Sequence, residues 1–184
     1  LKLKPEISAH GGEIISSVPN GWAEYSGTSM ASPNMAGAMA LMLSYIERNE
    51  YLSDETVATA VDKNRDRVAM ANFLYMSTAT IAYDQYNTPY SPRKQGAGLA
   101  DIAKAAKTQA YLYSDGIDKA KIEIGDDPEK TGVYELEFHA KNMGDVPRTY
   151  KLDTLTMTES VSSDEITVAE KAYMLDDMAT VRYE

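Results

Sequence analysis

The residues best suited to chemistry lie in one stretch, Tyr-Ser-Gly-Thr-Ser-Met-Ala-Ser-Pro at 25–33. Ser29 stands where an apolar helix is predicted to begin. There, unpaired N–H groups and the positive end of the helix dipole can stabilise an anion that forms beside a serine oxygen. Gly27 lets backbone and substrate approach closely. The stretch is therefore suited to nucleophilic attack by the Ser29 hydroxyl, with Gly27 and Thr28 expected to contact the substrate.

The same residues have a plain structural explanation. Ser and Thr commonly cap helices by accepting a hydrogen bond from the first turn, so Thr28 or Ser29 could simply be an N-cap before a core helix. Pro33 fits an early helical position in either case, because the N–H that it lacks has no partner there. The residues alone leave both explanations open.

The elements around this stretch are predicted to be strands before it and a helix after it. Short apolar runs separated by Gly-Gly and Pro-Asn-Gly turns predict strands over residues 1–28. From Ser29 to Ile46, apolar residues recur every three or four positions, with small residues between them. We therefore expect a helix that is apolar nearly throughout and buried in a larger fold.

Three further helices are predicted. One begins at an N-cap on Ser53, a second spans residues 67–76, and a third spans residues 99–110. The side chains expected to face inward from the first two are Val57, Ala60, Val61, Ala71, Leu74 and Tyr75. Residues 83–94 are rich in proline and tyrosine and are predicted to form a long loop.

The pattern of apolar and polar residues changes after about residue 112. Residues 121–124, 133–138 and 150–152 alternate apolar with polar side chains, which predicts half-buried strands. Short strands separated by turns favour a β-sandwich over residues 119–184, which we expect to be incomplete because this length is short for a sandwich of about 100 residues. Residues 1–118 then form a first domain.

Composition excludes several classes of function. The formal net charge is −10 and the sequence pI is about 4.7, so binding to nucleic acid is disfavoured. Without cysteine, the chain has no disulfide scaffold, thiolate zinc site or cysteine nucleophile. Its longest run of apolar residues and glycine, 35–43, is far shorter than the ~20 residues of a membrane span, and its first residues lack the apolar region of a signal peptide.

The sequence Gly-Thr-Ser-Met-Ala-Ser-Pro at 27–33 resembles the nucleophile motif of the subtilisin-like serine proteases, or subtilases. Residues 4–9 resemble the strand that precedes this motif, and Ala-Gly-Ala at 36–38 resembles the family's central helix. Gln-Gly-Ala-Gly-Leu at 95–99 resembles the closing segment of large subtilases of the lactocepin and streptococcal C5a-peptidase type. In those proteins a fibronectin-III-like sandwich follows the catalytic domain.

The resemblance implies an α/β fold and a serine endopeptidase that acts on polypeptides. Residues 1–118 would be the C-terminal portion of a three-layer subtilisin-like catalytic domain, and residues 119–184 a partial fibronectin-III-like sandwich. It also implies export to the medium or to a bacterial cell surface. Ser29 would form the acyl-enzyme, and its backbone N–H would be one oxyanion donor.

Subtilases order their catalytic triad Asp, His, Ser. The Asp, the His and the oxyanion-hole Asn are therefore expected upstream of Ser29, in the remainder of the same catalytic domain, and this chain alone is expected to be inactive. His10 stands where relatives often carry Pro and is expected to be a loop residue rather than the base. Asn34 stands where many relatives have His, which is not a triad member.

Two other functions remain as alternatives. The pattern Gly27-x-Ser29-x-Ala31 is one residue from the nucleophile elbow of α/β-hydrolases, whose triad runs Ser, acid, His, so His139 could be the base. However, an elbow needs an apolar strand directly before the serine, and residues 18–25 do not form one. In the other alternative, the chain is a non-catalytic scaffold or adhesion module and Ser29 is a helix cap.

No cofactor or metal is expected. Four aspartates lack the spacing of an EF-hand and are predicted to be solvated turn residues, so a calcium site in the parent protein is not supported by them. They are Asp115, Asp118, Asp126 and Asp127. Gly96 and Gly98 are predicted to form a loop-to-helix turn rather than a phosphate loop. Three tyrosines of the long loop either line a substrate groove or pack the loop; they are Tyr83, Tyr86 and Tyr90.

Overall fold

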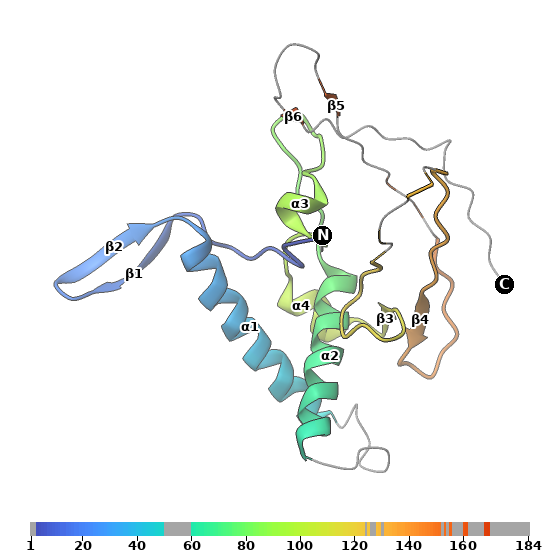
Figure 1. Cartoon of the computed structure of the whole chain (residues 1–184). Helices are drawn as coiled ribbons and strands as arrows, with labels where there is room; N and C mark the ends of the chain where they lie inside the picture. Colours follow the sequence, from blue (N-terminus) through green and yellow to red (C-terminus); the bar gives the residue numbers. More distant parts are fainter. Residues whose placement is uncertain are drawn as a thin grey trace.

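Helices and short antiparallel sheets make up the chain (Figure 1). The computed structural model describes residues 3–49, 60–123, 125, 128–129, 131–151, 153, 155, 160–161 and 168–169. Both element types of an α/β protein are present. Within the described residues, the strands form three separate two-stranded sheets that no central sheet joins. The three-layer arrangement is expected of the complete catalytic domain, of which this chain would be a portion, and stays a prediction.

A long hairpin occupies the N-terminal part and projects away from the helices (Figure 1). Strand β1 (Ile14–Val18) pairs antiparallel with β2 (Gly21–Tyr25), in a register that sets Ile14 opposite Tyr25 and Val18 opposite Gly21. Pro19 and Asn20 make the turn, as their preference for turns predicts. The predicted strands and the turn between them are confirmed at residues 14–25. Residues 4–9, which are expected to form a strand, instead carry only an isolated bridge at Ser8.

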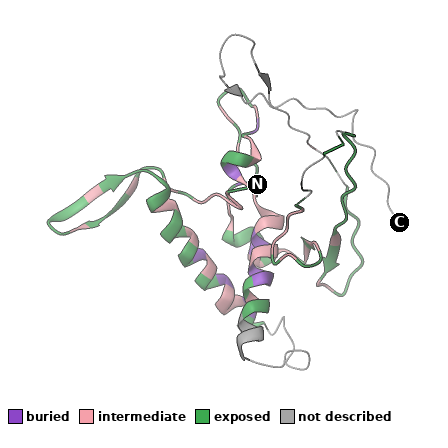
Figure 2. Cartoon of the chain, in the orientation of Figure 1, coloured by how far each residue is buried: buried purple, intermediate pink, exposed green. Residues whose placement is uncertain are grey.

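Helix α1 (Thr28–Arg48) follows the hairpin and buries one of its faces. Ala38, Met42 and Ile46 recur every four residues and lie in the core, whereas Leu41 is 62% exposed (Figure 2). The predicted helix is confirmed, but the expected burial on all sides is wrong for the chain as described. Within the described residues, helix α2 and helix α4 contact α1, and its opposite face meets no further layer.

Helix α2 (Ala60–Thr78) supplies the other half of the core. Ala71, Leu74 and Tyr75 are fully buried, as predicted, and the Tyr75 hydroxyl donates a 2.6 Å hydrogen bond to the Ala38 carbonyl oxygen of α1. The predicted helix of residues 67–76 is the second half of this longer helix. Ser53 and Val57 of the expected preceding helix lie outside the described residues.

Substitutions at two adjacent positions of α1 test this one-sided packing. Met42→Ala removes a side chain that is 1% exposed and should lower the free energy of unfolding by about 2–5 kcal/mol. Leu41→Ala removes an exposed side chain and should change it by less than about 0.5 kcal/mol. Urea unfolding followed by circular dichroism measures both, and equal losses would contradict the assignment of the buried face.

The proline- and tyrosine-rich loop is held by one buried amide. Gln95, in the short helix α3 (Pro92–Gln95), accepts a 2.7 Å hydrogen bond from the Ala82 N–H and donates to the carbonyl oxygens of Ala82 and Tyr90. The loop is therefore organised by the Gln95 side chain. The rings of Tyr83 and Tyr86 are half or more exposed, so they do not fill its interior.

Helix α4 (Ile102–Lys107) is shorter than the helix predicted over residues 99–110. It begins after Asp101, whose side chain accepts a 3.0 Å hydrogen bond from the Lys104 N–H and so caps the helix. Strand β3 (Ala110–Tyr113) follows and pairs antiparallel with β4 (His139–Asn142). The first strand of the second half therefore begins at Ala110, where the end of the helix is predicted.

The predicted strands of the second half are wrong where the structure describes them. Residues 133–138 alternate as expected, but they are exposed and pair with no described strand. The described parts of 121–124 and 150–152 also lack strand pairing. Alternation makes one face apolar, yet a strand also needs a neighbour for its backbone hydrogen bonds. The two remaining strands are β5 (Ser160–Val161) and β6 (Val168–Ala169), and most of residues 152–184 lie outside the described residues.

The N-terminal segment runs beside the glycine-containing turn after α3. The Ser8 N–H donates to the Gly98 carbonyl oxygen (2.9 Å), and the Ala100 N–H donates to the Ser8 carbonyl oxygen (2.8 Å). A Cβ atom at Gly96 would lie 2.3 Å from the carbonyl group of Glu6, so only glycine allows this approach. This confirms that Gly96 and Gly98 form a structural turn.

Glu6 joins this segment to the residues that follow β3. Its carboxylate is 2.7 Å from the Lys119 ammonium and 3.6 Å from that of Lys121, and it also contacts Lys4. Partial burial alone would raise the pKa of Glu6, but the hydrogen bonds from Lys119 and Lys4 outweigh it and lower the pKa from 4.5 to about 2. The ionised form of Glu6 therefore stabilises the fold.

The lowered pKa predicts a specific pH dependence. The contribution of Glu6 to stability should be complete above its ordinary pKa of 4.5 and should disappear as the pH falls toward about 2. Glu6→Gln should therefore destabilise the chain at pH 6 and make little difference near pH 2. Urea unfolding across this range measures the effect. The exposed Glu135→Gln is the control, and a pH-independent difference for Glu6→Gln would contradict the prediction.

Candidate active site

The start of helix α1 is formed by a glycine. Gly27 is the N-cap, with φ 148°, a conformation that favours glycine, and its carbonyl oxygen accepts hydrogen bonds from the N–H groups of Met30 (3.1 Å) and Ala31 (3.2 Å). Thr28 and Ser29 are the first two helical residues, and no side chain caps the helix. The capping role considered for Thr28 or Ser29 is therefore wrong.

Backbone contacts with the N-terminal segment hold this helix start in place. The Gly27 N–H donates a 2.8 Å hydrogen bond to the Gly11 carbonyl oxygen, and the Ser26 hydroxyl accepts a 2.8 Å hydrogen bond from the Glu13 N–H. A Cβ atom at Gly11 would lie 2.7 Å from the Gly27 carbonyl oxygen and 2.8 Å from the Ala31 Cβ. Gly11 therefore has to be glycine for the two segments to approach this closely.

Ser29 is exposed, as are Gly27 and Thr28 beside it. Among the described residues, no group hydrogen-bonds to the Ser29 hydroxyl or accepts from the Ser29 N–H. The first turn also contains no acidic residue. No negative side chain in the first turn therefore offsets the positive end of the dipole of this 21-residue helix. The free hydroxyl and free N–H of Ser29 lie at this end.

Pro33 lies deeper in the helix than its early-position preference suggests. It is the sixth helical residue rather than one of the first turn. The residue at this position would normally donate its N–H to the carbonyl oxygen four residues earlier, which is that of Ser29. Proline has no such N–H, so Ser29 lacks the usual helical donor to its carbonyl oxygen.

The two glycines of the Gly-Gly pair give a matched test of the helix support. Gly11→Ala should lower the free energy of unfolding by about 1–3 kcal/mol, because the added methyl group meets the backbone of Gly27 and Ala31. Gly12→Ala adds a methyl group that has nothing within 4 Å and should be tolerated. Urea unfolding measures stability, and hydrogen exchange of the Gly27 amide reports on the contact itself. Equal effects of the two substitutions would contradict this account.

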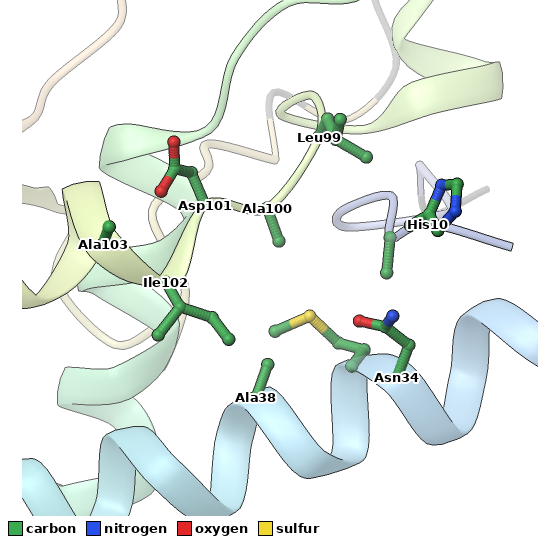
Figure 3. Close-up of a pocket in the computed structure, with 10 residues that line it drawn as sticks. His10, Asn34, Ala38, Leu99, Ala100, Asp101, Ile102 and Ala103 are labelled. Atoms are coloured by element: carbon green, nitrogen blue, oxygen red, sulfur yellow. The ribbon is translucent and has the colours of Figure 1, made fainter.

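His10 lies in a loop, as expected, and lines a pocket of about 300 Å³ (Figure 3). The pocket lies between the N-terminal segment, the Asn34 and Ala38 side of α1, and the beginning of α4. Ala38 is nine residues after Ser29, which places the two on opposite sides of a helix with 3.6 residues per turn. The pocket and Ser29 therefore belong to different faces of α1.

His139 is engaged elsewhere. Its Nε2 atom is 3.3 Å from an Asp115 carboxylate oxygen, and its ring stacks on Tyr113 with the centroids 4.9 Å apart. Strand β4, which carries His139, is well separated from the start of α1 (Figure 1). Within the described residues, the structure does not bring His139 to Ser29.

The aspartates of the second half do not gather. Asp115 contacts His139, and Asp118 accepts a 3.2 Å hydrogen bond from Arg65. Asp126 and Asp127 lie outside the described residues. Within the part of the chain that the structure describes, no three His, Asp or Glu side chains are placed to share a metal ion.

Sequence reasoning missed the residues that support the site from a distance. The Gly27–Gly11 and Glu13–Ser26 hydrogen bonds join residues whose spacing in the sequence matches neither a helix nor a strand repeat. The Gly-Gly pair was a usable signal, because adjacent glycines mark close backbone approach as well as turns. For Ser26 the sequence offered no signal.

The chain belongs to the subtilase family, which it matches over residues 1–98. It is 33% identical to the C5a peptidase of Streptococcus pyogenes serotype M3, over 92% of this chain and 14% of that protein. It is 34% identical to the PI-type proteinase of Lactococcus lactis subsp. cremoris, over 96% of this chain and 8% of that protein. The PII-type proteinase of Lacticaseibacillus paracasei is 33% identical, over 88% of this chain and 9% of its own length.

The expected membership of the lactocepin and C5a-peptidase type is therefore confirmed. The chain spans a small part of each of these relatives, all of which come from bacteria. No helix within the described residues is both long enough and apolar enough to cross a bilayer.

Proposed function

We propose that Ser29 is the nucleophile of a serine endopeptidase. The observation that carries this proposal is the Ser29 hydroxyl itself, exposed at the second residue of a long helix and without a capping role or a described hydrogen-bond partner. In the complete enzyme a histidine takes the Ser29 proton as the oxygen attacks the scissile carbonyl, and gives it to the leaving amine as the C–N bond breaks. Water then hydrolyses the acyl-enzyme and restores the Ser29 hydroxyl. The substrate is a polypeptide.

The helix start contributes the stabilisation of charge. The tetrahedral intermediate carries a negative oxygen, and the Ser29 N–H is a free donor in the described structure, at the positive end of the α1 dipole. Gly27 and Thr28 are exposed beside the hydroxyl, so we assign them to contact with the substrate. The hydrogen bond from Gly27 to Gly11 keeps this arrangement fixed before the substrate binds.

The remainder of the same catalytic domain is the partner that we propose for this chain. It supplies the catalytic base, the acid that orients the base and a second oxyanion donor. The face of α1 that carries Ser29 supports this. It is exposed and built of small residues that allow close approach of another backbone, followed by the exposed Leu41. These small residues are Ser32, Ala36, Gly37 and Ala40. On its own, the 184-residue chain is then inactive.

The two-domain division belongs to the same proposal. Residues 1–118 form the C-terminal part of the peptidase domain, and residues 119–184 begin a fibronectin-III-like module. Residues 133–138 carry exposed apolar side chains and are unpaired among the described residues, so we propose that the remainder of the second module covers them. Similarity to the C5a peptidase and to the PI- and PII-type proteinases supports export to the medium or the cell surface. No cofactor is required for this chemistry.

Labelling with a fluorophosphonate tests the nucleophile. In the full-length parent, the probe should modify Ser29, and Ser29→Ala should abolish both labelling and peptide hydrolysis. Ser32→Ala removes a neighbouring exposed hydroxyl and should leave labelling intact. Mass spectrometry of the labelled peptide identifies the modified residue.

The same reagent distinguishes the alternatives. The isolated 184-residue chain should not react, because a serine without a base keeps an ordinary hydroxyl. Strong labelling of the isolated chain would show that it contains its own base. Absence of labelling in an intact, folded parent would instead favour a non-catalytic scaffold.

A further inference from the structure

The two faces of the β1–β2 hairpin differ in exposure, because only one of them is exposed at every position. Residues directly opposite one another in an antiparallel pair share a face, and alternate residues of one strand do so as well. One face therefore carries Ile15, Ser17, Trp22 and Glu24, all exposed. The other face carries Ile14, Val18 and Ala23, which are half-buried, together with Ser16, Gly21 and Tyr25.

The exposed face combines an aromatic ring with a carboxylate. Trp22 is 77% exposed and is the only tryptophan in the sequence, and Ile15, its diagonal neighbour across the strands, is 66% exposed. Glu24 follows Trp22 by two positions on the same strand, so their side chains emerge about 7 Å apart. Among the described residues, Glu24 contacts no basic side chain.

This pair has the chemistry of a site for a basic side chain. An indole face attracts ammonium and guanidinium groups through its quadrupole, and a neighbouring carboxylate adds an ion pair. The hydrocarbon stem of Lys or Arg can lie along the Ile15 side chain while its charged end reaches Glu24. The overall charge of −10 favours the approach of such a cation.

The hairpin also offers a backbone edge. Within the described residues, β2 pairs with β1 along one edge and with no strand along the other. An extended peptide can add to such an edge through main-chain hydrogen bonds, with alternate side chains above the sheet. Strand β2 ends at Tyr25 and leads directly into Gly27 and the start of α1. A peptide along β2 is therefore directed toward Ser29.

We propose that the Trp22–Glu24 face binds a Lys or Arg side chain of an extended polypeptide substrate that lies along β2. The substrate role rests on the proposed function of Ser29, whereas the binding itself does not. Trp22 and Glu24 are thus determinants of specificity for a basic residue at some distance from the scissile bond.

Trp22 provides the measurement, because the emission of the 184-residue chain comes from this one indole. Two labelled Gly-Ser peptides are compared, one with a single Arg and one with citrulline, its neutral isostere, in the same place. The Arg peptide should shift the Trp22 emission and bind about five- to tenfold more tightly, by peptide anisotropy, than the citrulline peptide. Equal affinity of the two peptides would overturn the proposal.

Matched variants locate the site. Glu24→Gln should remove most of the preference for Arg without changing the affinity for citrulline, whereas Glu135→Gln, an equal change of charge at an exposed position outside the hairpin, should have no effect. Trp22→Leu, followed by anisotropy, should weaken Arg binding, and Tyr86→Leu, at a ring that is 79% exposed, should not. A preference that survives Glu24→Gln would place the site elsewhere and overturn the proposal.

Cleavage by the full-length parent separates the two proposals. Paired substrates with Arg or citrulline at a distance from the scissile bond should differ in KM, and Glu24→Gln should remove most of the difference. If the isolated chain binds Arg peptides but the parent shows no KM difference, the substrate role of the hairpin is overturned. If the parent shows neither labelling of Ser29 nor hydrolysis, the proposed function fails while the binding result for the isolated chain stands.

Discussion

The hydrogen bond from the Gly27 N–H to the Gly11 carbonyl oxygen is the constraint on which the candidate site depends. It fixes the residue before α1, and through it the direction in which Ser29 leaves the helix start. The contact exists because Gly11 has no side chain in the way, since a Cβ there would lie within 3 Å of both Gly27 and Ala31. Because backbone contacts hold the site in place, the Ser29 hydroxyl makes no hydrogen bond that the described part of the fold requires.

The core and the site use opposite faces of the same helix. Met42 and Ile46 anchor α1 against α2, and the buried hydroxyl of Tyr75 adds a hydrogen bond to the α1 carbonyl of Ala38. Ser29 lies on the other face, which consists of small residues. Stability and chemistry are therefore assigned to different side chains, so a change on one face leaves the other largely undisturbed.

Local patterns predicted the local structure well. The hairpin, helix α1 and the inward side of α2 follow from spacing and turn residues within a few positions of each other, and the Ser29 motif is likewise continuous in the sequence. The predictions failed where residues distant in the sequence determine the local structure. The cap is Gly27 rather than Thr28 because the segment at Gly11 holds the helix start, and residues 133–138 form no strand because alternation does not supply a partner. The network around Gln95 joins positions without any common period.

The contact between Ser8 and the turn at residues 95–98 also governs when the site can form during synthesis. The Ser8 hydroxyl donates to the Gln95 carbonyl oxygen, 87 positions away, and the neighbouring backbone bonds extend to Ala100. Contacts this distant in sequence form late, because a long loop must close first. The segment that carries Gly11 therefore lacks this anchor until the ribosome has released residue 100. Translation itself delays completion of the support beneath Ser29.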